Sequence, residues 1–229
     1  MPTIDLAAIG RRELNSRLHG LGADASDILW RIENPDGQHA LAVGMTAPVT
    51  IEIAGHAGYY CAGMNQHATV LIEGNVGVGV AENMMSGAIH VRGDAGQAAG
   101  ATAHGGLLVI EGNAAARCGI SMKGINIVVK GSVGPMSAFM AQSGALVVLG
   151  DAGDALGDSI YEAKLFVRGQ VTSLGADCVR KEMRAEHRLE LRALLEAAGV
   201  GPGVNLDEFK RYGSSRTLYN FHVDNAAAY

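Results

Sequence analysis

The sequence predicts an all-β fold: a single-stranded right-handed parallel β-helix of about seven coils, with a small N-terminal cap and C-terminal helices. Three observations support this prediction. Glycines recur every nineteen residues through more than half of the 229-residue chain, a short apolar strand pattern precedes each of them, and the stretches between them hold too many glycines for helices. Self-similarity at such a period is typical of stacked solenoids.

The glycine repeat defines the register of the coils. The repeated glycines, interpreted as structural corners, are Gly55, Gly74, Gly93, Gly112, Gly131, Gly150 and Gly169. The residues four and two positions ahead of each glycine are apolar, as in Ile51 and Ile53, which is the period of a half-buried strand. Stacking at about 4.8 Å per coil predicts a rod of about 30 Å. A left-handed hexapeptide helix needs a period that is a multiple of six, so we favour the right-handed form.

A polar residue follows the repeated glycine in every coil. These residues are His56, Asn75, Asp94, Asn113, Ser132, Asp151 and Gln170. Most of them are turn formers, and a glycine before a turn can adopt a positive φ at little cost. We therefore interpret this column as the corner of each coil.

Residues 1–48 are predicted to form an N-terminal cap segment. A short helix is expected from Arg11 to Leu18, ended by Gly20. Alternating apolar residues in 27–33, a turn sequence and a return over 39–43 predict a β-hairpin. Such a segment would cover the exposed strand edge of the first coil.

Residues 49–175 are assigned to the β-helix, and residues 176–229 to C-terminal helices and a docking tail. One helix is predicted over 178–198, and a second, short helix at Asn205, where Glu208 completes a capping box. The tail carries few charges and is a candidate for docking on a partner or on its own rod; its aromatic residues are Tyr219, Phe221 and Tyr229.

Composition excludes several classes of partner. The net charge is −5, which gives no basic face for nucleic acid. Apolar runs are too short for a membrane span and the N-terminus lacks the order of a signal peptide, so a cytoplasmic location is expected. Residues 49–169 hold only 6 Lys and Arg and 9 Asp and Glu. Such a sparsely charged rod suggests that other protein covers part of its surface.

The sequence predicts no catalytic, cofactor-binding or metal-binding residue in this chain. Cys61, Cys118 and Cys178 form no CxxC pair, and the first two stand at equivalent positions three coils apart, about 14 Å by stacking. We expect them to be buried apolar residues. Asp94 and Asp151 are separated by the same distance, which is too far for a paired-acid mechanism. The eight histidines show no metal-ligand spacing.

The repeat resembles the GXGXG repeat domain that closes the large subunit of glutamate synthase. The resemblance covers about residues 49 to 175, and its clearest units are GNVGVGVAENMMSGAIHVRG (74–93) and GSVGPMSAFMAQSGALVVLGDAGDALG (131–157). As a separate chain, it is most similar to the stand-alone β-helix subunit of N-methylglutamate synthase, or methylamine–glutamate N-methyltransferase. GYYCAGMNQHA, GVAENMMSGA and TLYNFHVDNAAAY fit that branch.

The resemblance implies a non-catalytic structural subunit of a glutamate-synthase-like complex that makes N-methylglutamate from methylamine and glutamate. Its expected partners are an amidotransferase-like chain and a synthase-like chain that carries FMN and an iron–sulfur cluster. The β-helix would hold the two together, and no catalytic residue of the family transfers to it.

Other functions remain open. One is a scaffold similar to the C subunit of formylmethanofuran dehydrogenase, which would give no reason for the aromatic tail. Another is a free-standing sugar-active β-helix enzyme, which needs a carboxylate cluster on one face. A free-standing ligand- or metal-binding module is the last.

Overall fold

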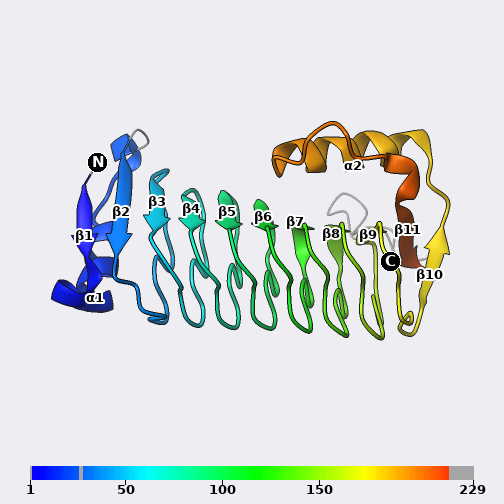
Figure 1. Ribbon diagram of the computed structural model, residues 1–229, viewed down its shortest axis with the longest axis horizontal. Helices are drawn as coiled ribbons and strands as arrows, with labels where there is room; N and C mark the ends of the chain where they lie inside the picture. Colours follow the sequence, from blue (N-terminus) through cyan, green and yellow to red (C-terminus); the bar gives the residue numbers. More distant parts are fainter. Residues whose placement is uncertain (1, 26–27, 217–229) are drawn as a thin grey trace, which may run out of the picture.

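The computed structural model describes residues 2–25 and 28–216, and these form a long parallel β-solenoid (Figure 1). The strands form one sheet in the order β1-β2-β3-β4-β5-β6-β7-β8-β9-β11-β10. The elements are β1 (Thr3–Asp5), α1 (Leu6–His19), η1 (Ala23–Ala25), β2 (Leu29–Glu33), β3 (Thr50–Ile53), β4 (Thr69–Ile72), β5 (Ala88–Val91), β6 (Leu107–Ile110), β7 (Lys123–Val129), β8 (Ser143–Val148), β9 (Lys164–Val167), β10 (Cys178–Lys181), α2 (Ala185–Ala197), η2 (Leu206–Glu208) and β11 (Lys210–Ser214).

The strand register confirms the predicted repeat and fold class. From β3 to β9 each strand pairs in parallel with the next at a nineteen-residue offset, as in Ile51 with Val70 and Val70 with Ile89, apart from a register shift at the start of β7. The two apolar residues of each strand point inward and are buried, for example Ile51 and Ile53. A second column of single bridges, from Ala57 to Val171, stacks on the other side of the coils.

The glycine corners are required by close stacking. A Cβ on Gly93 would lie 2.1 Å from Oδ1 of Asn75, and one on Gly112 would lie 2.3 Å from Oδ1 of Asp94. Of the seven glycines only Gly55 has a positive φ, at 150°. From Gly74 to Gly169, each glycine therefore makes room for the polar side chain and backbone of the preceding coil, a role different from the positive-φ turn expected from sequence.

The polar column forms a ladder between coils. Each side chain accepts a hydrogen bond from the backbone N–H of its counterpart in the next coil, at 2.7–2.9 Å, through all six steps from His56 to Gln170. Asp94 and Asp151 thus use one carboxylate oxygen each to satisfy a backbone donor.

The six coils that begin at Gly55 to Gly150 each contain three left-handed residues in alternate positions. Their φ values lie between 51° and 74°, and the residues are Tyr60, Ala62, Met64, Gly79, Ala81, Asn83, Ala98, Gly100, Thr102, Arg117, Gly119, Ser121, Met136, Ala138, Met140, Ala155, Gly157 and Ser159. Such a conformation costs about 1–2 kcal/mol for a residue with a side chain. Hydrogen bonds offset this cost: the N–H of Ala81 reaches back to Cys61, while that of Gly79 reaches forward to Gln97.

The predicted N-terminal hairpin is wrong. Strand β2 pairs in parallel with β1 on one side and β3 on the other, and residues 39–43 form turns instead of a return strand. Asn34 stands where Gly55 stands in the next coil and has a φ of 54°. The segment is therefore an altered coil of the same stack. The predicted helix lies within α1, which begins earlier because Asp5 accepts a hydrogen bond from the N–H of Ala7.

The C-terminal helix is shorter than predicted. Its first expected residues form β10, which pairs antiparallel with β11, and α2 begins at Ala185 and is followed by Gly199 with a φ of 67°. At Asn205 the side chain accepts a hydrogen bond from the N–H of Asp207, but only a 3-10 turn forms. The Glu208 side chain pairs with Arg168 instead of completing a capping box. No helix in the described ranges is long and apolar enough to cross a membrane.

Candidate partner-binding surface

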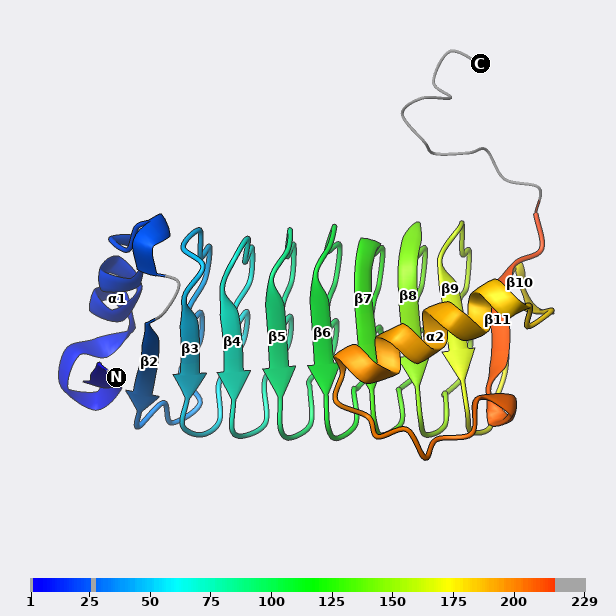
Figure 2. The same cartoon turned by 90° about the horizontal axis from the view of Figure 1, so that it is seen from above.

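The outer face of the sheet has two halves that differ in sequence: outward residues are mixed in character on β3 to β5 and apolar on β6 to β9. One outward row runs along the rod through Glu52, Leu71, His90, Val109, Val128, Val147 and Phe166. The last four are buried together with Leu191, Leu194 and Leu195 of α2. Figure 2 shows α2 running diagonally across β7, β8 and β9. The apolar half of the row is thus covered, and the half on β3 to β5 remains uncovered.

Polar contacts hold the covering helix at its sides. The ammonium of Lys164 donates to the Glu190 carboxylate at 2.6 and 2.8 Å, and Arg188 pairs with Asp207. Phe209, in the turn before β11, is buried in the same cluster. The helix and the chain that returns from it therefore form one packed layer on the later coils.

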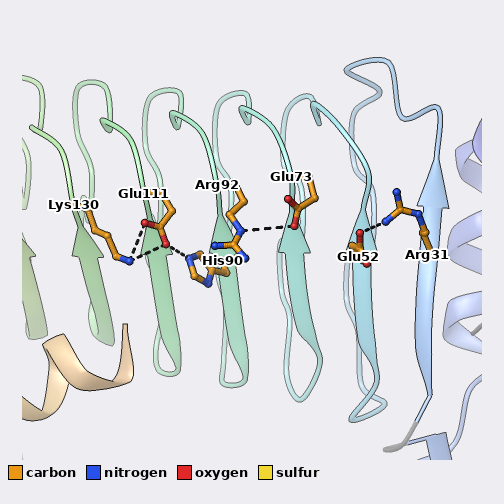
Figure 3. Close-up of polar contacts among 7 residues, drawn as sticks. All are labelled: Arg31, Glu52, Glu73, His90, Arg92, Glu111 and Lys130. Atoms are coloured by element: carbon orange, nitrogen blue, oxygen red, sulfur yellow. Dashed lines mark hydrogen bonds and ion pairs between the residues drawn. The ribbon is translucent and has the colours of Figure 1, made fainter. Parts of the chain in front are cut away.

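Charged side chains and one histidine occupy the uncovered half and its border with the covered half, and they are here called the charged lattice (Figure 3). Its residues are Arg31, Glu52, Glu73, His90, Arg92, Glu111 and Lys130. Each contact joins neighbouring coils, at the strands or one residue beyond their ends, with Arg92 Nε 3.7 Å from Glu73 and His90 Nε2 2.5 Å from Glu111. The pair of Arg92 with Glu73 is exposed, and such pairs contribute about 0–1 kcal/mol each. The exposed pair therefore adds little to the stability of the fold.

Glu111 is the most connected member of the charged lattice. Partial burial favours its neutral form, but hydrogen bonds and charges from Lys130 and His90 outweigh burial and lower its pKa below the ordinary value. The Lys130 ammonium lies 2.8 Å from one of its oxygens. The carboxylate is therefore ionised and held at the border between the lattice and the face under α2.

A few apolar side chains are exposed on the turn side of the rod. Tyr59 is 57% exposed and stacks on the ring of His39, with 4.5 Å between centroids. Val78 stands at the equivalent position of the next coil and is also exposed, as are Met64 and Met85. Such residues are common on monomer surfaces and do not by themselves mark a site.

The cysteines do not fit a metal or cluster site. Cys61 and Cys118 are fully buried, and burial raises the pKa of each thiol to about 12. The pKa of Cys178 is raised to about 11 for the same reason. A cluster ligand must be a thiolate, and these environments oppose ionisation. Among the residues that the structure describes, no three His, Cys, Asp or Glu side chains gather as metal ligands do.

The structure places the predicted features in different regions. The corner glycines and the polar column align along one edge of the rod. The tail residues Tyr219, Phe221 and Tyr229 lie outside the described residues. Sequence analysis missed the charged lattice and the docking face of α2. The signal for the latter was present, because β6 to β9 contain the runs LLVI, IVV, LVV and LFV where β3 and β5 read TIEI and AIHV.

Comparison with known proteins identifies one clear relationship. No protein-family profile matches the chain, and no solved structure matches it. Protein GlxC of Rhizobium meliloti (strain 1021) is 63% identical over 229 residues, which is 100% of both proteins. The match fits a GXGXG domain of the glutamate-synthase type and does not select the N-methylglutamate synthase branch. With this identity over its whole length, the chain belongs to the GlxC family.

Proposed function

We propose that this chain is a non-catalytic structural subunit of a glutamate-synthase-like complex that makes N-methylglutamate from methylamine and glutamate. It holds an amidotransferase-like chain and a synthase-like chain with FMN and an iron–sulfur cluster, and the complex is cytoplasmic. The observation that carries the proposal is the division of the outer sheet face. One half is sealed by the chain's own helix, and the other presents an ordered charged lattice.

Rigidity supports a role in spacing two partners. Adjacent coils are joined by strand pairing, by bridges on the opposite side and by the polar ladder. A rod connected at all three columns keeps a fixed distance between proteins bound at different points along it. A labile amine released at one centre reaches the other more efficiently when both are held in place.

The charged lattice supports recognition by a protein partner. Its side chains come from β2, β3 and β5 and from the residues directly after β4 to β7, and they contact their neighbours, so little conformational freedom remains to be lost on binding. Complementary charges on a partner select orientation and increase the association rate. The buried cysteines agree with an arrangement in which FMN and the cluster reside in another chain.

Purification of the tagged chain from its native source tests the proposal. We expect it to elute with an amidotransferase-like chain and with a yellow-brown chain whose absorbance spectrum shows flavin and iron–sulfur bands. The eluted complex is expected to form N-methylglutamate from methylamine and glutamate. A colourless chain that elutes alone, or a complex inactive with methylamine, contradicts this function.

A further inference from the structure

A cavity lined by cations lies at the C-terminal end of the rod, where β11 passes between β9 and β10 (Figure 1). Its volume is about 210 Å³, and its lining includes Lys181, Arg211 and Arg216. The one carboxylate in the lining belongs to Glu162, which is exposed. The lining therefore carries more positive than negative charge.

Two of these cations stand opposite each other without a counter-ion. Lys181 and Arg211 are direct partners in the antiparallel pairing of β10 with β11. Like charges at such positions destabilise a sheet. Within the described part of the chain, no carboxylate forms an ion pair with either side chain. Acidic side chains at this end pair with other cations instead, in the pairs Lys164–Glu190, Arg184–Glu182, Arg184–Glu186 and Arg216–Asp177.

The guanidinium of Arg211 is incompletely satisfied. One of its Nη atoms donates to the carbonyl of Glu182 at 3.1 Å. Its Nε–H is buried and has no hydrogen-bond partner among the residues that the structure describes, which is a costly state for a donor. Burial and the charge of Arg184 lower the pKa of Arg211 below its ordinary value, yet an arginine remains protonated in proteins. Negative charge is therefore missing at this point.

Gly213 keeps space open beside the two cations. It lies within β11 and lines the cavity. Unlike the corner glycines, it is not required by close stacking, because a Cβ would lie 3.7 Å from both the carbonyl oxygen of Ala163 and Cγ of Lys181. A glycine within a strand weakens it and often marks the close approach of a ligand. No contact within the described chain explains this glycine.

We propose that the cavity binds a small carboxylate anion, which lies beside Gly213 between Lys181 and Arg211 and supplies the missing negative charge. Ammonium and guanidinium groups form strong charge-assisted hydrogen bonds with carboxylates. The volume equals that of about seven waters at about 30 Å³ each, so the cavity accommodates a small organic acid. Glu162 at the rim repels a phosphate dianion more than a monocarboxylate.

Titration of the purified full-length chain with propionate, followed by NMR, tests this inference. We expect saturable shifts of the Gly213 and Lys181 amide signals with propionate, and none with propionamide, which has a similar shape but no charge. Ionic strength is kept constant with sodium chloride, because salt screens exposed charges. Equal responses to the two compounds, or no response to propionate, would overturn the proposal. Tighter binding of inorganic phosphate would contradict the assignment to a carboxylate.

Full-length variants locate the site. The double change Lys181→Gln with Arg211→Gln is expected to weaken binding of propionate at least about tenfold, through loss of charge-assisted hydrogen bonds. Gly213→Val keeps every charge but fills the cavity, and we expect the same loss. The matched control Arg12→Gln with Lys123→Gln removes one arginine and one lysine at exposed positions and is expected to bind as the wild type does. Wild-type affinity of the Gly213 variant, or an equal loss in the control, would place the anion elsewhere.

A second titration distinguishes a free ligand from an acidic side chain of a partner. It uses the chain purified from its native source together with the proteins that elute with it. The proposal expects propionate to bind this material with unchanged affinity. Loss of binding in the assembled state would show that a partner fills the cavity and would overturn a free carboxylate as the occupant.

Discussion

The corner glycines show how one residue type can be selected by stacking between coils. Their backbone φ is mostly ordinary, and what excludes a side chain is the polar residue and backbone of the preceding coil. A repeat of nineteen residues therefore places glycine where each coil meets the previous one most closely. The same ladder satisfies backbone donors that no strand pairing reaches.

The substitution Gly112→Ala tests this explanation. The new Cβ would meet Oδ1 of Asp94 at 2.3 Å and the carbonyl oxygen of Gly93 at 2.9 Å. We expect a loss of about 1–3 kcal/mol in the free energy of unfolding, measured by denaturant titration. The control Gly201→Ala has no atom within 4 Å of its new Cβ and is expected to stay within about 0.5 kcal/mol of the wild type. Equal losses would refute the steric argument.

At the level of elements, the outward row of the sheet decides where α2 lies. The row changes from Glu52, Leu71 and His90 to a continuous apolar run, and the helix covers that run. A sheet that is apolar on both faces must bury both, whereas an alternating one needs only a core. The position of α2 therefore follows from four outward residues in four successive coils, which are Val109, Val128, Val147 and Phe166.

Two leucines of α2 provide a matched test. Leu191 is fully buried against the sheet, and Leu189 is 69% exposed. We expect Leu191→Ala to lower the free energy of unfolding of the helix layer by about 2–5 kcal/mol and to increase proteolysis within α2. Leu189→Ala is expected to change it by less than about 0.5 kcal/mol. The account of this interface is incorrect if the two variants behave alike.

The predictability of the elements depends on how strictly the repeat is kept. The seven coils were predictable because glycine and strand positions recur without insertions. The coil containing β2 was missed because Asn34 replaces the glycine and its offset to β3 is 21 residues. Strand β10 was assigned to a helix because Val179 also fits an apolar helical stripe, yet it is exposed on a strand.

The left-handed columns could not be predicted from local preference. They contain Ala, Thr, Met and Arg, which rarely adopt a positive φ. Hydrogen bonds to both neighbouring coils select this conformation, and those partners lie about nineteen residues away. The charged lattice was missed for the same reason, since its pairs come together only after the coils stack.

At the level of the whole molecule, α2 covers one half of the outer sheet face, and the charged lattice lies on the other half. We expect Arg92→Glu to reduce capture of a partner at least about tenfold. The change would place a third carboxylate between Glu73 and Glu111, which stand at the equivalent positions of the two neighbouring coils. Arg92 is exposed and 3.7 Å from Glu73, so the folded state should lose less than about 1 kcal/mol. Pull-down with purified partner chains measures this, and Arg180→Glu on β10 is the control. Unchanged capture by the Arg92 variant would place the interface elsewhere.

The central claim is that this chain joins two others. The most direct measurement is purification of the tagged amidotransferase-like chain from cells with and without this subunit, followed by quantification of the flavin-containing chain that elutes with it. The account predicts that the flavin-containing chain elutes only when the subunit is present, and that its reintroduction restores the complex. Equal recovery of the two partners without the subunit would contradict a joining role.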